Sequence, residues 1–344
     1  MTCQARLFGG AGPVMVRRVG LIRNIAAALV ALILCAAPAA QAREMALTFD
    51  DLPYAGWPFS EDLAGGERVT GAILATLAQY QAPAIGFVNE GRLDVPDERE
   101  ARIALLRRWA DAGAPLANHT YSHADLNALT IDQFEGEIVR GETAIKALTP
   151  PHATRYFRYP FNHLGNTAEK LAAIDSFLAQ RGYVVAPHTI DSEDFIFNAV
   201  YREALEKNDE AAAAKTQAAY IDFVIGAAAF AETIAPRVVG HDIPQVILLH
   251  ANDLNADTLG ALLDRLGKRG YHFVTLDAAM RDPAYATPYT FVTANGPTWL
   301  WRWRKLLKRD VSFAADPEPP AWVTAAFDRI TQPPAAKAAN GEQQ

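Results

Sequence analysis

The pattern that most constrains the fold is an alternation of short apolar runs with longer amphipathic runs along most of the chain. Met45–Phe49, Ala84–Val88 and Gln245–His250 predict strands, while Leu63–Tyr80 and Thr258–Arg269 carry apolar residues at helical spacing. Repeated strand–helix units are typical of a parallel sheet covered by helices. The alternation therefore predicts a parallel α/β architecture, and by itself it leaves a barrel and a doubly wound sheet open.

Other segments of the chain add to this pattern or interrupt it. Ile131–Leu148 predicts a single helix, and Tyr183–Ile190 predicts a single strand. An Ala-rich segment at 197–240 predicts an inserted helical pair on the outside of the barrel. We expect a C-terminal extension at 285–331 and a disordered tail at 332–344, which is rich in Ala, Pro and polar residues.

The extension contains an unusual stretch, Trp299–Arg309, in which tryptophan alternates with basic residues. Two interpretations stay open. The stretch is either an aromatic, basic patch that contacts glycan or a membrane surface, or a terminal helix whose tryptophans cover the barrel.

The composition excludes several classes of protein. Hydrophobic residues make up 50% of the chain and charged residues 21%, which is unlike a disordered, collagen-like or coiled-coil protein. No Gly-rich phosphate loop follows a predicted strand, so a nucleotide cofactor is not expected. The net charge of −7 argues against a nucleic-acid partner.

The N-terminal segment has the three parts of a secretory signal peptide. Arg17, Arg18 and Arg23 precede an apolar run from Ile25 to Ala40, which ends in the small-x-small pattern Ala40-Gln41-Ala42. We expect cleavage of residues 1–42 and export to the periplasm or the extracellular space, with no stable membrane span afterwards. A membrane anchor is the alternative, although the run is near the lower length limit for a span. A lipoprotein modified at Cys35 is disfavoured because Leu34 is bulky.

Loss of the leader changes the chemistry that the chain can use. The only two cysteines, Cys3 and Cys35, lie in the leader, so the remainder has no disulfide and no thiolate metal site. The leader also holds four arginines and no acid, which leaves 28 basic against 39 acidic residues and a formal charge of −11. An exported chain of this kind depends on its core or on a bound metal for stability.

Five clusters of polar or charged residues stand at the carboxyl ends of predicted strands, where parallel α/β folds build their active sites. They are Thr48–Asp51, His119–His123, Arg158–Phe161, Asp191–Phe195 and Leu248–His250. Each fragment alone is weak, because an Asp pair is commonly a solvated loop and a His pair a surface feature. Five such fragments on one repeating architecture are a specific signal. If His119–His123 forms a helical turn, both imidazoles share one face and can bind one ion.

These clusters resemble the five motifs of the polysaccharide deacetylases, carbohydrate esterase family 4. The resemblance covers roughly Met45 to Leu276, over two thirds of the chain. It implies a distorted parallel (β/α) barrel of about seven strands at 43–284. Two positions depart from the family pattern: Phe161 stands where Tyr is common, and Phe195 replaces the usual Trp. The second departure bears on substrate choice rather than on the chemistry.

The resemblance also implies the roles of individual residues. Asp51, His119 and His123 would bind one divalent ion, and this nitrogen and oxygen ligand set fits Zn²⁺ first, with Co²⁺, Ni²⁺ or Mn²⁺ as alternatives. Asp50 would be the general base, oriented by Arg158, and His250 would be the general acid, supported by Asp194. The backbone N–H of Phe161 would bind the oxyanion, and Leu248 would contact the substrate.

The function implied is that of an exported, metal-dependent hydrolase that removes N-acetyl groups from an amino-sugar polymer or oligomer such as peptidoglycan or chitin oligomers. The same attack by water would serve acetyl esters of xylan or small cyclic amides, so these substrates stay open. A non-catalytic glycan-binding module is a further alternative, which the presence of both Asp50 and His250 disfavours.

Overall fold

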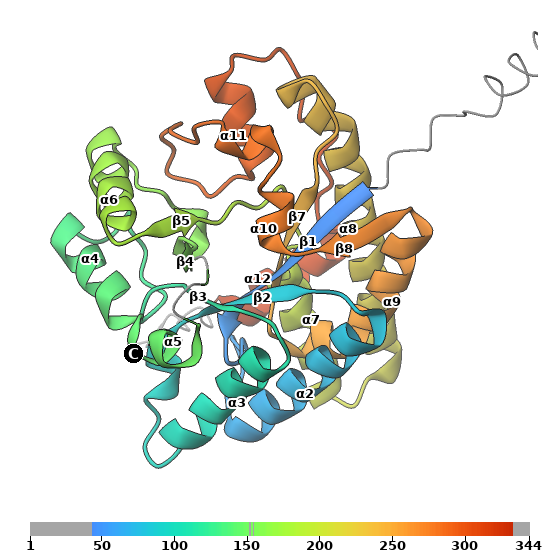
Figure 1. Ribbon diagram of the computed structural model, residues 1–344. Helices are drawn as coiled ribbons and strands as arrows, with labels where there is room; N and C mark the ends of the chain where they lie inside the picture. Colours follow the sequence, from blue (N-terminus) through green and yellow to red (C-terminus); the bar gives the residue numbers. More distant parts are fainter. Residues whose placement is uncertain (1–42, 151–152, 154, 333–344) are drawn as a thin grey trace, which may run out of the picture. The chain divides into compact units, whose positions relative to one another are not determined.

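The computed structural model describes residues 43–150, 153 and 155–332 of the 344-residue chain (Figure 1). The expected signal peptide at 1–42 and nearly all of the expected disordered tail at 332–344 lie outside the described residues, so both stay predictions.

One parallel sheet organises the fold. Seven strands are hydrogen-bonded in the order β5-β4-β3-β2-β1-β7-β6, and β8 pairs with the start of β1. The strands are β1 (Arg43–Leu52), β2 (Ala84–Val88), β3 (Leu116–Asn118), β4 (Arg155–Phe157), β5 (Tyr183–Val185), β6 (Ile190–Asp191), β7 (Gln245–His250) and β8 (Tyr271–Val274). Every pair is parallel, and the sheet curls into the distorted barrel that the family resemblance implies.

Helices surround the outer side of the sheet (Figure 1). They are α2 (Leu63–Tyr80), α3 (Arg99–Asp111), α4 (Ile131–Arg140), α5 (Thr143–Leu148), α6 (Ala168–Gln180), α7 (Asp194–Glu206), α8 (Glu210–Val239), α9 (Asp253–Lys268), α10 (Leu276–Ala279), α11 (Trp299–Leu306) and α12 (Ala321–Thr331), with short 3-10 helices at Glu90–Leu93, Pro160–Asn162 and Pro283–Ala286. The N-terminus of α2 is capped by a residue next to it in the sequence, because the side chain of Asp62 accepts a hydrogen bond from the N–H of Gly65.

Alternation along the strands divides the apolar residues into two layers. On β1, Leu47 and Phe49 belong to the large core beneath the helices, whereas Ala46 belongs to a smaller cluster on the opposite face of the sheet. Side chains two apart share a face, so Thr48 and Asp50 follow Ala46 on that second face. The same spacing on β7 runs from Val246 through Leu248 to His250. The two-residue alternation of side chains along each strand therefore places Asp50 and His250 on the same face, at the carboxyl ends of β1 and β7.

The strand predicted at Tyr183–Ile190 is wrong in one respect, because the structure divides it between the two ends of the sheet. β5 pairs with β4, while β6 pairs with β7. Pro187, in the connection, has no N–H to donate to a ladder. The connection spans the opening of the barrel, with Ala186 N–H donating to Phe157 O at 2.8 Å and Thr189 N–H to Val246 O at 2.8 Å.

The single helix predicted at Ile131–Leu148 is also wrong, because the structure breaks it into α4 and α5 at Gly141. A Cβ at Gly141 would lie 2.9 Å from the carbonyl carbon of Thr120 and 3.0 Å from Asn118 Oδ1. The break therefore lets the chain pass close to the loop that carries the second motif.

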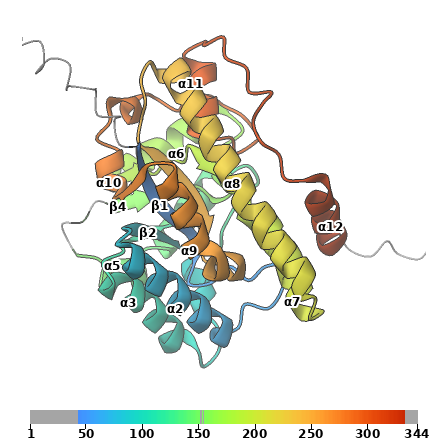
Figure 2. The ribbon, with the colours of Figure 1, turned by 90° about the vertical axis from the view of Figure 1, so that its right-hand side faces the viewer.

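The helical pair expected at 197–240 is observed as α7 and α8, and it forms the crossover between β6 and β7. Figure 2 shows α8 running from the region of α11 toward α7. By length and composition α8 is the one helix in the described part of the chain that could cross a membrane. Here its apolar side packs against α7, α9 and α11, as a core helix of the domain does.

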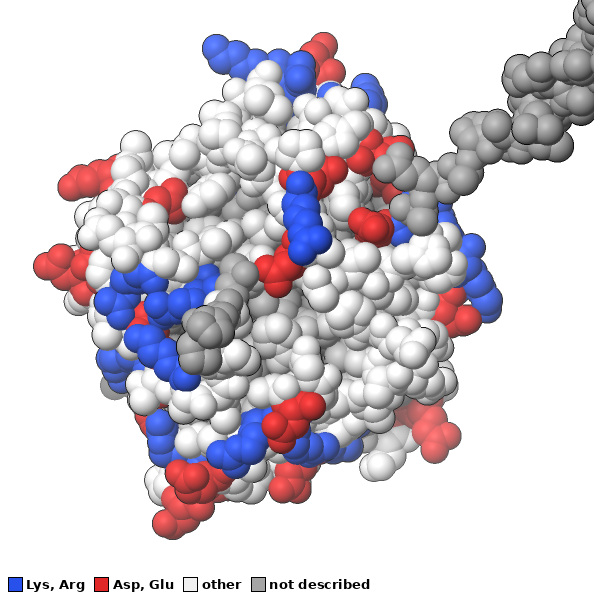
Figure 3. Space-filling view, in the orientation of Figure 1, with Lys and Arg blue, Asp and Glu red and all other residues white. Residues whose placement is uncertain are grey.

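The C-terminal extension is an ordered part of the domain. α11 buries Trp299, Leu300 and Trp303, which agrees with the interpretation that this stretch covers the barrel. α12 packs on α7, where Arg329 binds both carboxylate oxygens of Glu203 at 2.7 and 2.6 Å. On the face drawn in Figure 3, charged side chains of both signs are scattered over the surface, near its middle as well as at its edge.

Candidate active site

A cavity of about 550 Å³ opens at the rim where the parallel strands end. All five sequence clusters contribute to it or lie directly behind it. Of the predicted site residues, those that line the cavity are Asp50, Asp51, His119, His123, Phe161, Leu248 and His250. Two others, Arg158 and Asp194, are buried behind Asp50 and His250.

A bulge at the end of β1 aims two consecutive carboxylates at this cavity. The register between β1 and β2 shifts between Phe49 and Leu52, and Asp51 takes a left-handed backbone conformation with φ of 65°. In a regular strand, neighbouring side chains point to opposite faces. The bulge removes that alternation, which is how Asp50 and Asp51 both reach the cavity.

Asp51, His119 and His123 form a cluster in which one atom from each lies within 4.8 Å of the others. Asp51 Oδ1 is 3.6 Å from Nε2 of His119 and 3.5 Å from Nε2 of His123. Asp51 Oδ1 is also buried and accepts no hydrogen bond in the described structure. A buried carboxylate oxygen without a donor is costly, and a cation between it and the two nitrogens would satisfy it.

The backbone of the second motif is a loop and not the helical turn that the spacing suggested. Thr120 and His123 both have positive φ, 66° and 57°, and the two imidazole rings lie 5.0 Å apart. The ring of His119 is held from behind, because its Nδ1 lies 2.8 Å from the carbonyl oxygen of Arg158. That carbonyl selects the tautomer with hydrogen on Nδ1, which leaves the Nε2 lone pair directed at the cluster.

The charge states of this cluster suit a divalent ion. Burial lowers the pKa of His119 and of His123 to about 4, so both imidazoles are neutral near pH 7 and can donate a lone pair. Burial acts to raise the pKa of Asp51, but the neighbouring His123 and Arg92 outweigh it and hold that pKa below its ordinary value. One carboxylate and two neutral imidazoles match the donor set of a catalytic zinc site.

Arg92 is a site residue that the motif analysis missed. It follows β2 in the 3-10 helix Glu90–Leu93, and its guanidinium donates to Asp51 Oδ2 at 3.1 Å and also pairs with Glu61. Asp51 therefore has one oxygen held by Arg92 and the other directed at the two imidazoles. The sequence could have pointed to Arg92, because this residue follows the end of a predicted strand, as the five clusters do.

Asp50 is held by a buried arginine. Arg158 is 1% exposed, and its guanidinium donates to Asp50 Oδ1 at 2.8 Å, to Thr48 Oγ1 at 2.7 Å and to the carbonyl of Pro187 at 2.8 Å. Burial raises the pKa of Asp50, and the charge of Arg158 opposes that rise. The second carboxylate oxygen of Asp50 lies 3.8 Å from Nε2 of His119. A carboxylate positioned in this way can accept a proton beside the cluster.

His250 is the cross-strand neighbour of Asp50, since the two residues are partners in the β1–β7 pairing. Asp194 is fully buried, and its carboxylate lies 2.5 Å from Nδ1 of His250. Burial acts to lower the pKa of His250, but Asp194 outweighs it and raises that pKa to about 10. His250 is therefore an imidazolium at neutral pH and can donate a proton from Nε2.

Apolar and aromatic residues form the rest of the cavity wall. The centroid of the Phe161 ring lies 4.4 Å from that of His123, and the centroid of the Phe195 ring lies 6.2 Å from that of His250. Leu248 lines the cavity, as expected. Trp57 also lines it and is 52% exposed; no motif pointed to this residue.

Two further histidines lie outside the metal cluster. His163 Nδ1 contacts Asp125 at 3.0 Å, and His188 is fully buried against Trp299. Both ring nitrogens of His188 lack a hydrogen-bond partner in the described structure. Neither residue belongs to the cluster formed by Asp51, His119 and His123.

Comparison with known proteins gives a match to the family model for polysaccharide deacetylase over residues 38–177. The chain is 36% identical over 117 residues to a chitooligosaccharide deacetylase of Rhizobium leguminosarum, covering 34% of this chain and 46% of that protein. It is 24% identical over 239 residues to a peptidoglycan-N-acetylglucosamine deacetylase of Bacillus cereus, covering 68% of this chain and 66% of that protein. The alignments thus span less than two thirds of these relatives.

A solved structure, the chitin deacetylase from the fungal pathogen Colletotrichum lindemuthianum, aligns with 74% of this chain and 93% of its own, at 21% identity and a TM-score of 0.46. The family model covers the segment that contributes Asp50, Asp51 and both imidazoles of the cluster. The five motifs meet in one cavity, and the segment 38–177, which carries the first three of them, is similar to the polysaccharide deacetylase family.

Proposed function

We propose that this protein is an exported, metal-dependent deacetylase that hydrolyses N-acetyl groups on an amino-sugar polymer or oligosaccharide. The observation that carries the proposal is that a cluster of three possible metal ligands shares one cavity with a carboxylate and an imidazolium. Arg158 holds the carboxylate of Asp50, and Asp194 holds the imidazolium of its cross-strand neighbour His250. Deacetylases of N-acetylglucosamine-containing glycans are among the relatives, which supports the substrate class.

The residues divide the chemistry of amide hydrolysis between them. Asp51, His119 and His123 would hold the ion, Zn²⁺ first, and a bound ion would polarise water and the acetamide carbonyl. Asp50 takes the proton that the attacking water gives up, while Arg158 keeps its carboxylate oriented.

Bond cleavage then requires an acid. An amine leaves poorly unless it is protonated, and the imidazolium of His250 supplies that proton. Asp194 holds the ring in place throughout. The backbone N–H of Phe161 is the proposed donor to the oxyanion, a role that needs no side-chain hydroxyl. The products are acetate and the free amine of the sugar.

The cavity wall supports a sugar as the substrate. Seven large hydrophobic side chains are exposed in the described part of the chain, and the three aromatic ones, Trp57, Phe161 and Phe195, all line this cavity. Exposed apolar surface gathered at one cavity marks a ligand-binding site. The apolar faces of pyranose rings are suited to such flat aromatic surfaces.

Acetate release tests the function. Purified protein with added zinc is incubated with N-acetylglucosamine oligomers, peptidoglycan, acetylated xylan and a small cyclic amide, alongside Asp50→Asn. We expect acetate from an amino-sugar substrate, dependent on metal and on Asp50. Release from xylan alone would assign an ester deacetylase, opening of the amide ring would assign a cyclic amidase, and turnover of none would favour a non-catalytic binding module.

Export is tested separately. The chain is expressed with its leader, and the N-terminus of the accumulated protein is sequenced in each cell fraction. We expect a mature chain that begins at Arg43 in the periplasm or the medium. A chain that keeps residues 1–42 and stays in the membrane fraction would contradict export by cleavage.

A further inference from the structure

The turn Pro160–Asn162, which carries the Phe161 amide, has an unusual backbone. Phe161 and its neighbour Asn162 both have positive φ, 56° and 53°, although neither is glycine. Non-glycine residues in this region are strained, and they persist only when the surrounding structure determines them. The contacts that determine this turn therefore decide where the Phe161 amide points.

One contact comes from Arg302 on α11, in the C-terminal extension. Arg302 is 0% exposed, and its guanidinium donates to the carbonyls of Asn162 at 2.9 Å, Phe291 at 3.1 Å and Asn295 at 3.3 Å. Burial lowers its pKa to about 10. In the described structure no carboxylate forms an ion pair with Arg302, and its two terminal nitrogens donate to these loop carbonyls instead.

A second contact comes from Gly296, in the loop between Phe291 and α11. A Cβ at Gly296 would lie 1.9 Å from the carbonyl oxygen of Phe161 and 2.9 Å from Cβ of Asn162. The backbone of this loop therefore packs directly against the turn, and only glycine fits. Asn127 fixes the same loop from another direction by donating to Ala294 O at 2.8 Å.

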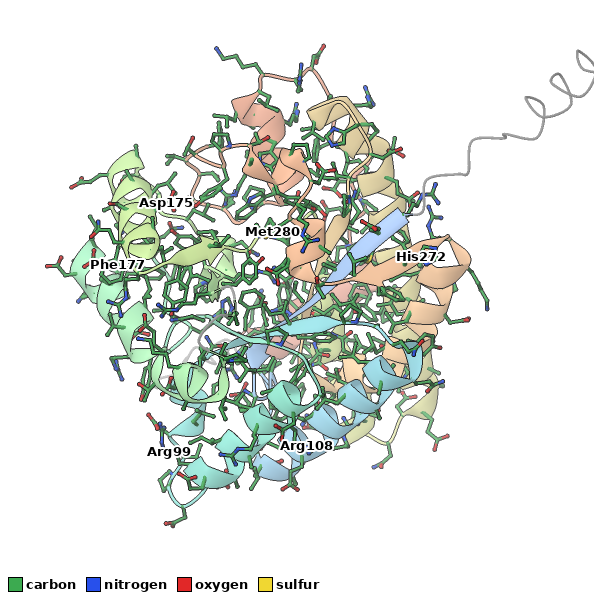
Figure 4. The ribbon with its side chains drawn as sticks, viewed as in Figure 1. Arg99, Arg108, Asp175, Phe177, His272 and Met280 are labelled. Carbon is green, nitrogen blue, oxygen red and sulfur yellow. The ribbon has the colours of Figure 1, made fainter. Side chains whose placement is uncertain are left out.

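A third contact links the extension to the residue before the turn. Tyr159 and Tyr289 both donate to Asp175 Oδ1, at 3.0 and 3.1 Å. Asp175 lies on α6 and is labelled in Figure 4. The extension thus contacts both sides of the Pro160–Asn162 turn, although it lies outside the segment 38–177 that matches the family model.

We propose that the C-terminal extension holds the Pro160–Asn162 turn in its catalytic conformation, with Arg302 as the positioning residue and Gly296 as the point of closest contact. The inference rests on the proposed function for the role of the Phe161 amide. A donor that is aimed at the oxyanion before the reaction accelerates it because no reorganisation is needed. We call the contacts of Arg302 and Gly296 with this turn the clamp. Loss of the clamp should therefore lower kcat and leave the metal ligands intact.

The test compares Arg302→Met with Lys305→Met, which removes a positive charge from an exposed position on the same helix. Hydrogen exchange of the peptide 157–165 is measured on substrate-free protein, together with bound metal, kcat and KM. For Arg302→Met we expect faster exchange in this peptide, unchanged metal content, KM within about threefold of wild type, and kcat lower by about 10- to 100-fold. Lys305→Met should match wild type in hydrogen exchange, metal content, kcat and KM.

Gly296→Ala is the second variant, and it keeps Arg302. It should also lower kcat, so it tests the clamp if Arg302→Met does not fold. Unchanged exchange in 157–165 in a folded variant would overturn the clamp, and faster exchange with wild-type kcat would overturn its role in catalysis. Because exchange is measured without substrate, this result stays distinct from a wild-type protein that releases no acetate, which would overturn the proposed function instead.

Discussion

Asp194 binds His250 at two points. One carboxylate oxygen lies 2.5 Å from Nδ1 of the imidazole, and the other accepts the backbone N–H of the same residue at 2.6 Å. Asn255 also donates to Asp194, which fixes the carboxylate from a third side. The ring is thereby held in one orientation and kept protonated, with the pKa of His250 raised to about 10.

The first prediction concerns this pair. Asp194→Asn keeps the shape of the side chain and removes its charge, so the pKa of His250 should fall by about 1–3 units. Since His250 acts as the acid, the alkaline fall in kcat should move to lower pH by a similar amount. The measurement is kcat against pH under one fixed metal loading, because a bound cation lowers this pKa in both proteins. An alkaline limb at the same pH in both proteins would contradict the assignment of His250.

The same pair predicts a dependence of stability on pH. The pKa of His250 is higher in the folded chain than the value of about 6.5 expected in the unfolded chain. Its contribution to stability is therefore complete below that unfolded value and is lost as the pH rises toward 10. Urea unfolding from pH 6 to pH 10 should show a decline in wild type that is smaller in Asp194→Asn. An equal decline in both would contradict the pairing.

The next prediction concerns the buried Asp50–Arg158 pair. Arg158→Met leaves a buried carboxylate without its partner, which should destabilise the fold by about 3–5 kcal/mol and abolish turnover. The double variant Asp50→Asn with Arg158→Met removes the unpaired charge as well. Its free energy of unfolding in urea should be closer to wild type than that of Arg158→Met. Strictly additive effects would show that the two side chains do not interact.

Trp57 should act on substrate binding. Trp57→Ala removes an aromatic surface that is 52% exposed at the cavity and is not one of the three residues of the metal cluster. KM for an acetylated oligosaccharide should rise about tenfold, which corresponds to about 1.4 kcal/mol, with little change in metal content. Leu307→Ala, at an exposed apolar residue outside the cavity, is the control. Equal KM values for wild type and Trp57→Ala would exclude a substrate contact.

Much of this site follows from the sequence. The predicted bounds of β2 and β7 match the structure, because each is a short apolar run with clear ends. The meeting of Asp51, His119 and His123 also follows, because parallel strands place their carboxyl ends at one rim.

Other features depend on tertiary contacts that no local pattern encodes. The helical turn expected at His119–His123 is wrong because Thr120 and His123 adopt positive φ in a loop held against Gly141. The hydrogen bond from Arg302 to Asn162 joins residues 140 positions apart. Arg302 is conspicuous only after folding, as a buried charge without an acid.

Removal of the metal should destabilise the protein. A ligand that binds only the folded state adds about 2.7 kcal/mol when its free concentration is a hundredfold above Kd. Chelation should therefore lower the melting temperature of wild type by several degrees. The melting curve of His119→Ala should not respond to chelator. Identical curves for wild type with and without chelator would mean that no ion of appreciable affinity is bound.

The most direct test of the central claim is the number of metal ions bound per chain in four proteins dialysed against zinc: wild type, His119→Ala, Asp50→Asn and His272→Ala. His272, an exposed residue on β8 labelled in Figure 4, is the matched control. The account predicts one ion in wild type, His272→Ala and Asp50→Asn, and close to none in His119→Ala. Equal metal content in His119→Ala and wild type, or no bound ion in wild type, would contradict a catalytic ion held by Asp51, His119 and His123.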